Sequence, residues 1–131
     1  MEKVYEKHLI TDDKTDITPQ AVKNLLDGSY WAPNRSLELI EKTIENSICV
    51  GVFQGDTLIG FARVVTDKAV FAWIADVIVA ETHRGKGLGK EIMNFIQAHP
   101  DIPEHSQLLR TKDAHGLYEK YGFKISETMT K

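Results

Sequence analysis

The sequence predicts one α/β domain in which a mixed, mostly antiparallel sheet is flanked by helices. Two β runs joined by Gln54-Gly55-Asp56 form a hairpin signature. A nearly continuous apolar strand over residues 70–79 then leads through a glycine-rich turn into a helix, which is the beginning of a β-α-β unit with a parallel strand pair. The expected element order over residues 1–131 is β-α-α-β-β-β-α-β-α-β.

The amino-terminal part is expected to contain one strand and two helices. Residues 4–10 can form the strand, although their alternation is only fair. Thr18 followed by Pro19 begins a helix, because threonine is a good N-cap and proline suits the first helical position. Ser36 caps a second helix. The loop between these helices, residues 30–35, is unusually rich in large side chains.

The rest of the chain alternates strands and helices. Pro100 and Gly122 each end a helix. Asp76 interrupts an otherwise apolar strand, and a carboxylate at such a place must find partners or lie beside a cavity. The predicted elements are strands over 48–53, 57–66 and 70–79, a helix over 88–99, a short strand near 108–111, a helix over 114–121 and a last strand over 123–127.

Composition limits the classes of function. A net charge of −3 argues against a general nucleic-acid binder. One cysteine excludes an internal disulfide and a multi-cysteine metal site. No apolar run approaches the ~20 residues that cross a bilayer, and the charged amino terminus lacks the apolar core of a signal peptide. We therefore expect a cytoplasmic protein without metal, membrane or nucleic-acid partners.

The most informative stretch is the glycine-rich turn that ends at Lys90. Its three alternating glycines remove side chains, so that a ligand can approach the backbone closely. Consecutive N–H groups at a helix start carry partial positive charge and suit a phosphate or pyrophosphate. Arg84, Lys86 and Lys90 add formal charge of the same sign.

Two familiar phosphate motifs do not fit this turn. A Walker A loop needs Ser or Thr after Gly-Lys, whereas Glu91 follows Gly89-Lys90. The fingerprint G-x-G-x-x-G needs glycine where Lys90 or Ile92 stands. P-loop nucleotide chemistry is therefore disfavoured, and a glycine turn that merely ends a strand stays open.

Two stretches are distinctive: Arg84-x-x-Gly87-x-Gly89 in the turn, and AHGLYEKYGF over residues 114–123. Together they resemble motifs of the GNAT superfamily of N-acetyltransferases. Arg84-x-x-Gly87-x-Gly89 resembles its acyl-CoA pyrophosphate motif, Q/R-x-x-G-x-G/A. Residues 114–123, AHGLYEKYGF, resemble its carboxy-terminal signature A-x-x-L-Y-E-K-x-G-F. Both occur in the right order with the expected strands between them, so the resemblance covers nearly the whole chain. It is closest to small uncharacterised bacterial GNAT proteins and brings no known substrate with it.

The resemblance implies a site for acetyl-CoA. In this family the backbone N–H groups of the turn hold the phosphates, and the preceding strand pairs with the pantetheine arm where it separates from the next strand. An N–H of that strand can polarise the thioester carbonyl. The residues that match the cofactor site are Ile78, Val79, Arg84, Gly85, Lys86, Gly87, Leu88, Gly89, Lys90, Thr111 and Tyr118.

The same resemblance implies that Tyr118 is a general acid beside the sulfur. The acceptor must be a neutral amine, and at a pKa of roughly 10.4 only about one amine in 2,500 is neutral at pH 7. Asp76 is the preferred base because it breaks an apolar strand, and a purely structural acceptor role for it is equally open. Glu81 and His83 are weaker candidates.

Two positions depart from the family pattern. Thr111 stands where many members have an asparagine, and it can still form a hydrogen bond with the cofactor. Ala75 stands where some members have a glutamate base. The second departure slightly favours the alternative of an acyl-CoA sensor without turnover, whereas the retained Tyr118 disfavours it.

The acceptor site is expected in the loop between the first two helices and at nearby strand ends. Aromatic side chains there could hold an apolar or cationic group, and Arg35 could pair with a carboxylate. A small amine, an amino acid and a protein amino terminus all remain open as acceptors. Exposed sheet edges in a short chain are compatible with a homodimer. The candidate substrate-binding residues are Tyr30, Trp31, Arg35, Phe71 and Trp73.

Overall fold

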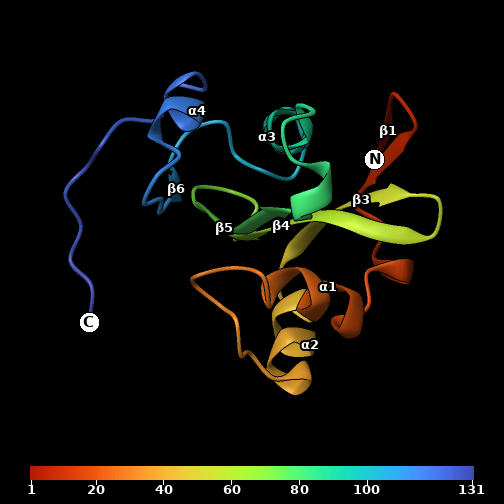
Figure 1. The fold of residues 1–131 in the computed structure, drawn as a ribbon. Helices are drawn as coiled ribbons and strands as arrows, with labels where there is room; N and C mark the ends of the chain where they lie inside the picture. Colours follow the sequence, from red (N-terminus) through yellow and green to blue (C-terminus); the bar gives the residue numbers. More distant parts are fainter.

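The structure, a computed structural model, describes residues 1–131. A single six-stranded sheet separates α1 and α2 on one face from α3 and α4 on the other (Figure 1). The elements are β1 (Glu2–Tyr5), β2 (His8–Thr11), η1 (Lys14–Asp16), α1 (Pro19–Leu26), α2 (Leu37–Glu45), β3 (Ile48–Gln54), β4 (Thr57–Thr66), β5 (Ala72–Val79), η2 (Glu81–His83), α3 (Leu88–Ala98), β6 (Gln107–Leu109) and α4 (His115–Glu119).

The strands follow one another in the order β1-β2-β3-β4-β5-β6. Every neighbouring pair is antiparallel except β5 and β6, which are parallel and are joined through α3. The predicted mixed, mostly antiparallel sheet is thereby confirmed. None of the helices is long and apolar enough to cross a membrane.

Each face of the sheet buries its own core. The α3 face contains Phe95, Ile92 and Met93 of the helix, packed on strand residues such as Val50. The opposite face buries the apolar stripes of α1 and α2 against β4 and β5. The predicted caps of these two helices are present, because Thr18 accepts from Ala21 N and Ser36 accepts from Leu39 N, at 3.1 Å in both cases.

The first predicted strand, residues 4–10, is wrong in detail, because the chain folds there into a hairpin. Tyr5 pairs with His8, which leaves a two-residue turn at Glu6 and Lys7. Glu6 takes a φ of +54°, although neither turn residue is glycine or asparagine. The turn therefore carries no signal that the sequence could have shown.

The last predicted strand, residues 123–127, does not form. The chain beyond Gly122 runs as an irregular tail past β6 and away from the sheet (Figure 1), and Ile125 is 86% exposed. The neighbouring strand β6 has only three residues, so a paired tail would gain few backbone hydrogen bonds. These would not offset the conformational entropy lost by ordering the tail.

The strand predicted from residue 70 begins at Ala72. The carboxylate of Asp67 accepts from the N–H groups of Ala69, Val70 and Phe71, at 2.9 to 3.1 Å. These bonds hold the three residues in a turn. Their N–H groups are therefore not available to the sheet.

Candidate active site

The glycine-rich turn connects β5 to α3 through η2. Gly85 and Gly87 have φ values of +79° and +81°, a region that residues with a Cβ rarely adopt. Gly87 is the N-cap of α3 and supplies no side-chain cap. Leu88 anchors the helix start in the α3 core, because its side chain is fully buried.

The N–H groups of Gly85 to Lys90 donate to no atom of the protein. The first bond of the helix runs from Glu91 N to Gly87 O, at 3.0 Å. Lys86 and Lys90 are exposed beside these donors, and Arg84 is held near them because its Nε donates to Val79 O, at 3.1 Å. The turn thus combines free backbone donors with positive charge, which is the chemistry of an anion site.

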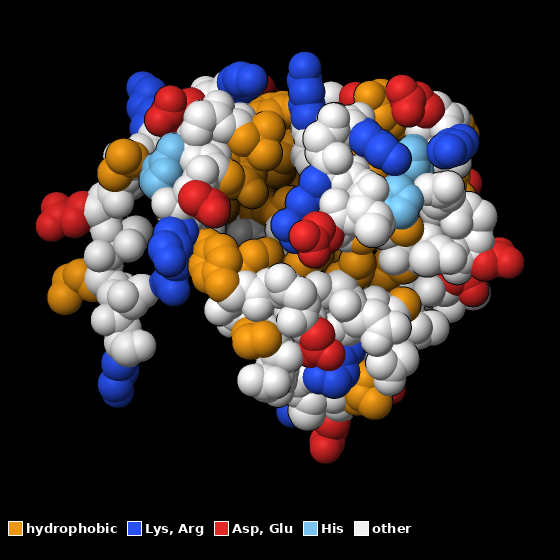
Figure 2. All heavy atoms as spheres, viewed as in Figure 1, with side chains coloured by type: hydrophobic (Ala, Val, Ile, Leu, Met, Phe, Trp, Pro, Cys, Tyr) orange, Lys and Arg blue, Asp and Glu red, His pale blue; other side chains and the backbone are white.

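The two parallel strands beside this turn separate. β6 pairs with β5 only at Ala72, Trp73 and Ile74, so the edge of β5 from Ala75 to Val79 has no partner strand. Ile78 and Val79 lie in this segment and pair on their other side with Phe61 and Gly60 of β4. Figure 2 shows hydrophobic side chains lining a hollow between the region of α4 and the region of α3. An extended ligand could pair with the free strand edge there.

Tyr118 lies on α4, the helix whose region borders this hollow. Its ring packs against Phe123 at 6.2 Å between centroids, and it contacts the α3 core. Burial, followed by the charges of Tyr30 and Asp113, raises the pKa of Tyr118 above its ordinary value. The phenol is therefore a proton-bearing donor at neutral pH.

The side chain of Thr111 forms a hydrogen bond with the nearby backbone. Its hydroxyl oxygen accepts from Ala114 N, at 2.9 Å, just before α4. The hydroxyl proton remains able to donate. Thr111, which stands where many family members have an asparagine, thus keeps one polar group at this position. The same hydroxyl also stabilises the backbone just before α4, the helix that carries Tyr118.

Asp76 accepts from three side chains on the α1–α2 side of the sheet. Trp31 Nε1 lies at 2.9 Å, Arg35 Nη1 at 2.8 Å and Arg63 Nε at 2.6 Å. Burial alone would raise the pKa of the Asp76 carboxyl, but the hydrogen bonds and charges of Arg35 and Arg63 outweigh it and hold that pKa below the ordinary value. A carboxylate so stabilised is a weak base, and the geometry favours its structural role.

The local backbone explains how Asp76 reaches this position. It has a φ of +54° and lies in a bulge, where Ala62 of β4 faces both Asp76 and Val77. The bulge shifts the alternation of β5, so that Ile74 packs in the α3 core whereas Ile78 packs in the α1–α2 core. Asp76 therefore points to the same face as the loop that carries Trp31 and Arg35.

Removing the Asp76 charge should destabilise the fold. In Asp76→Asn two partly buried guanidinium groups lose their counter-charge, and we expect a loss of about 2 to 3 kcal/mol in the free energy of unfolding. Because the folded pKa is lowered, the wild-type contribution is complete above the ordinary value of 3.8 and is lost as pH falls through the folded pKa. Urea unfolding at pH 7 and pH 3 measures both effects, and a similar loss at the two pH values would contradict this account.

The other two candidate bases are placed less favourably or are already occupied. Glu81 is exposed at the start of η2. His83 uses both ring nitrogens, with Nε2 2.7 Å from Gln54 Oε1 and Nδ1 2.9 Å from Thr82 Oγ1. Partial burial and the nearby charge of Lys86 lower the pKa of His83, but its neutral ring has no free lone pair for a substrate.

The structure brings together only some of the candidate acceptor residues. Tyr30 and Trp31 stack edge to face at 5.1 Å, and Trp31 joins Arg35 at Asp76. Tyr30 is 60% exposed, and Lys112 lies 5.4 Å from its ring. The α1–α2 loop thus reaches the segment that precedes α4 and Tyr118.

Phe71 and Trp73 lie apart from this group. Phe71 is exposed in the turn before β5, at the end of the strand away from the glycine turn. Trp73 lies under the guanidinium of Arg110, at 5.7 Å. Sequence reasoning missed Arg63 as part of the site, although a lone cation in an apolar strand was a usable signal.

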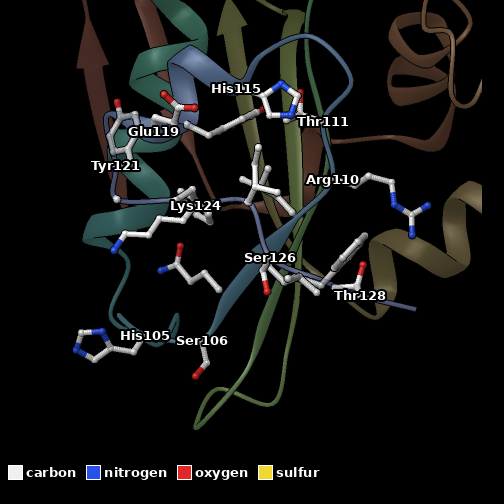
Figure 3. A pocket seen from close by; sticks show the side chains of 18 of the residues that line it. His105, Ser106, Arg110, Thr111, His115, Glu119, Tyr121, Lys124, Ser126 and Thr128 are labelled. Atoms are coloured by element: carbon white, nitrogen blue, oxygen red, sulfur yellow. The ribbon is translucent and has the colours of Figure 1, made fainter. Parts of the chain in front are cut away.

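A cavity of about 830 Å³ lies between β6, α4 and the tail (Figure 3). Tyr118, Thr111 and Trp73 line it, but no residue of the glycine-rich turn does. Figure 3 shows side chains of the tail, such as Lys124 and Ser126, across from those of α4. The cavity occupies the space between β6 and the tail that a paired last strand would have closed.

The fold is that of an acetyltransferase, and the family model of the acetyltransferase (GNAT) domain matches residues 45–125. The chain belongs to the GNAT family of acetyltransferases. The predicted family is thereby confirmed.

Individual relatives agree. A crystal structure described as belonging to the GNAT family, from Xanthomonas campestris pv. campestris, is 36% identical with a TM-score of 0.86, covering 91% of this chain and 85% of that one. An uncharacterized N-acetyltransferase ycf52-like protein of Prochlorococcus marinus is 38% identical over 57% of this chain, which spans only 44% of that relative. An uncharacterized N-acetyltransferase ycf52 of Pyropia yezoensis is 27% identical over 93% of this chain and 74% of the relative.

Proposed function

We propose that the protein is an N-acetyltransferase that transfers an acetyl group from acetyl-CoA to a primary amine, by direct attack in a ternary complex. The observation that carries the proposal is the run of N–H groups from Gly85 to Lys90 without acceptors in the protein. They fit the diphosphate of the donor, with Arg84, Lys86 and Lys90 supplying charge.

The free edge of β5 supports binding of the pantetheine arm of acetyl-CoA. From Ala75 to Val79 this strand has unpaired backbone groups that could bind the amide-containing pantetheine arm, as an added strand would. Acetyl-CoA supplies a thioester, whose carbonyl carbon is attacked by the amine nitrogen while the C–S bond breaks. A backbone N–H near Ile78 and Val79 would stabilise charge on the carbonyl oxygen.

Tyr118 would act on the departing sulfur. Full transfer of a proton from a phenol to a thiolate is uphill by roughly 2 kcal/mol in unperturbed terms, and burial of Tyr118 raises its pKa further. We therefore assign to its hydroxyl a hydrogen bond to the sulfur as negative charge develops there. The thiolate formed takes its proton from solvent at a later stage.

The amine would lose one proton to water before it attacks, and its nitrogen would lose a second to water as the C–S bond breaks. Asp76 is held by Arg35 and Arg63, and His83 has no free nitrogen, so neither is well placed for proton removal. Asp76 instead would fix Trp31 and Arg35 at the acceptor side. The acceptor would lie between Tyr30, Trp31 and Tyr118, where the α1–α2 loop meets the segment before α4.

The first test is isothermal titration of the wild-type protein with acetyl-CoA, CoA and ATP. We expect micromolar binding of both CoA species and much weaker binding of ATP, which has no pantetheine arm for the β5 edge. An amine panel would follow, with thiol release measured by a chromogenic disulfide. Failure of a folded protein to bind either CoA species would contradict the proposal, and binding without release from any amine would favour an acyl-CoA sensor.

A further inference from the structure

The hairpin of β1 and β2 touches the glycine-rich turn and the start of α3. Tyr5 Oη donates to Lys86 O, at 3.2 Å, and Lys3 forms an ion pair with Glu91. The ring of His8 lies edge to face with that of His83, at 6.2 Å between centroids. In Figure 1 this hairpin rises on the side of the sheet that carries α3. The chain's first residues thus contact a segment about eighty residues further on.

The bond from Tyr5 sets the direction of one particular donor. The carbonyl of Lys86 and the N–H of Gly87 belong to the same peptide group, and in a trans peptide they point in opposite directions. Because Tyr5 holds the carbonyl on the hairpin side, the Gly87 N–H points away from the hairpin. That N–H is one of the free donors of the turn.

Gly87 leaves the space that Tyr5 uses. A Cβ on Gly87 would lie 3.1 Å from Tyr5 Oη, which is tighter than ordinary van der Waals contact. The glycine therefore permits both the positive φ of the turn and the close approach of the tyrosine. No other glycine of the turn has a neighbour within 4 Å of such a Cβ.

Lys3 contributes through charge. Glu91 lies in the first turn of α3, where a carboxylate would repel an anion bound at the same helix start. The ammonium group of Lys3 balances that carboxylate. Its contribution should weaken at high salt, because the Lys3 side chain is 44% exposed.

We propose that the β1–β2 hairpin is a positioning element for the phosphate-binding turn, in which Tyr5 orients the Gly87 N–H toward a bound diphosphate and Lys3 neutralises Glu91. This inference rests on the proposed function, because it presupposes that the turn binds the diphosphate of CoA. Neither residue touches the reacting atoms. Tyr5 and Lys3 are therefore expected to affect donor affinity rather than the chemical step.

Tyr121 offers a matched control, because its hydroxyl contacts α3 near the same turn. Its single hydroxyl proton is within reach of two acceptors, Lys90 O at 3.0 Å and Asn94 Oδ1 at 2.7 Å. The peptide that contains Lys90 O has Glu91 N as its donor, and this N–H is already used within the helix. Removing the Tyr121 hydroxyl therefore takes away a comparable bond without freeing or turning a phosphate-facing donor.

The experiment compares Tyr5→Phe and Tyr121→Phe with the wild type by titration with CoA and by steady-state kinetics. For Tyr5→Phe we expect the Kd for CoA and the KM for acetyl-CoA to rise about three- to tenfold, as for loss of one hydrogen bond, with kcat at saturating donor unchanged. For Tyr121→Phe we expect a lower Tm and an unchanged Kd. The Tm of both variants, measured without ligand, separates stability from affinity.

Each outcome bears on one of the two claims. Wild-type binding of CoA together with an unchanged Kd in Tyr5→Phe would overturn the positioning role alone. An equal loss of affinity in both variants would also overturn it, because the effect would then be general to α3. Absence of CoA binding by the folded wild type would overturn the proposed function, and this role with it.

Discussion

Gly87→Glu is expected to abolish binding of acetyl-CoA, with the Kd rising by at least about 100-fold, or about 2.7 kcal/mol. Three effects add. The backbone at φ +81° disfavours any Cβ, that Cβ would press on Tyr5 Oη at 3.1 Å, and the carboxylate would place negative charge where the diphosphate must lie. Isothermal titration with acetyl-CoA measures the change.

Gly55→Glu is the control for this substitution. Gly55 also has a positive φ, of +60°, but a Cβ there meets nothing within 4 Å and the residue lies in the β3–β4 turn. The same side chain should therefore cost about 1 kcal/mol in stability while leaving the Kd for acetyl-CoA nearly unchanged. Acetyl-CoA binding by Gly87→Glu at the wild-type Kd would show that the donor phosphates are held elsewhere.

Tyr118→Phe is expected to lower kcat about 100-fold while changing the Kd for CoA less than about twofold. The ring keeps its packing against Phe123, so the variant loses only the donor that would face the sulfur. Thiol release under single-turnover conditions measures the chemical step directly. Phenylalanine cannot stabilise charge on the leaving thiolate, which is why the effect falls on turnover.

Tyr121→Phe provides the comparison, because it removes a hydroxyl three residues further along that faces α3 instead of the hollow. It should leave kcat within about twofold of the wild-type value, since the bonds it loses are structural. Equal turnover by folded Tyr118→Phe and wild type would remove Tyr118 from the mechanism. The leaving thiolate would then have to be stabilised by solvent.

Much of the fold could be predicted because its signals are local. The β3–β4 hairpin, the apolar strand β5 and the two capped helices each depend on residues close together in the sequence. The first hairpin and the tail could not be predicted in this way. The turn at Glu6 lacks turn residues, and whether residues 123–127 pair depends on the length of β6 far from them in the fold.

The candidate site likewise has a part that could be predicted from the sequence and a part that could not. The glycine-rich turn is a contiguous motif, so its residues could be named from the sequence. The network around Asp76 joins side chains from the α1–α2 loop, β4 and β5, at separations of up to 45 residues. A lone carboxylate and a lone guanidinium in neighbouring apolar strands indicate that partners exist, but only tertiary structure selects which ones. The bulge that turns Asp76 toward them leaves no mark in the pattern of apolar residues.

The bulge at Asp76 has a consequence for attempts to exchange specificity between relatives. The loop that would meet the acceptor is fastened, through Trp31 and Arg35, to the strand whose free edge would meet the donor. Replacing that loop alone would remove the hydrogen bonds that Trp31 and Arg35 donate to Asp76, and would leave Asp76 paired with Arg63 only. The α1–α2 loop, the bulge at Asp76 and Arg63 depend on one another structurally. We therefore expect a loop exchange between relatives to give a folded protein only when all three are transferred together.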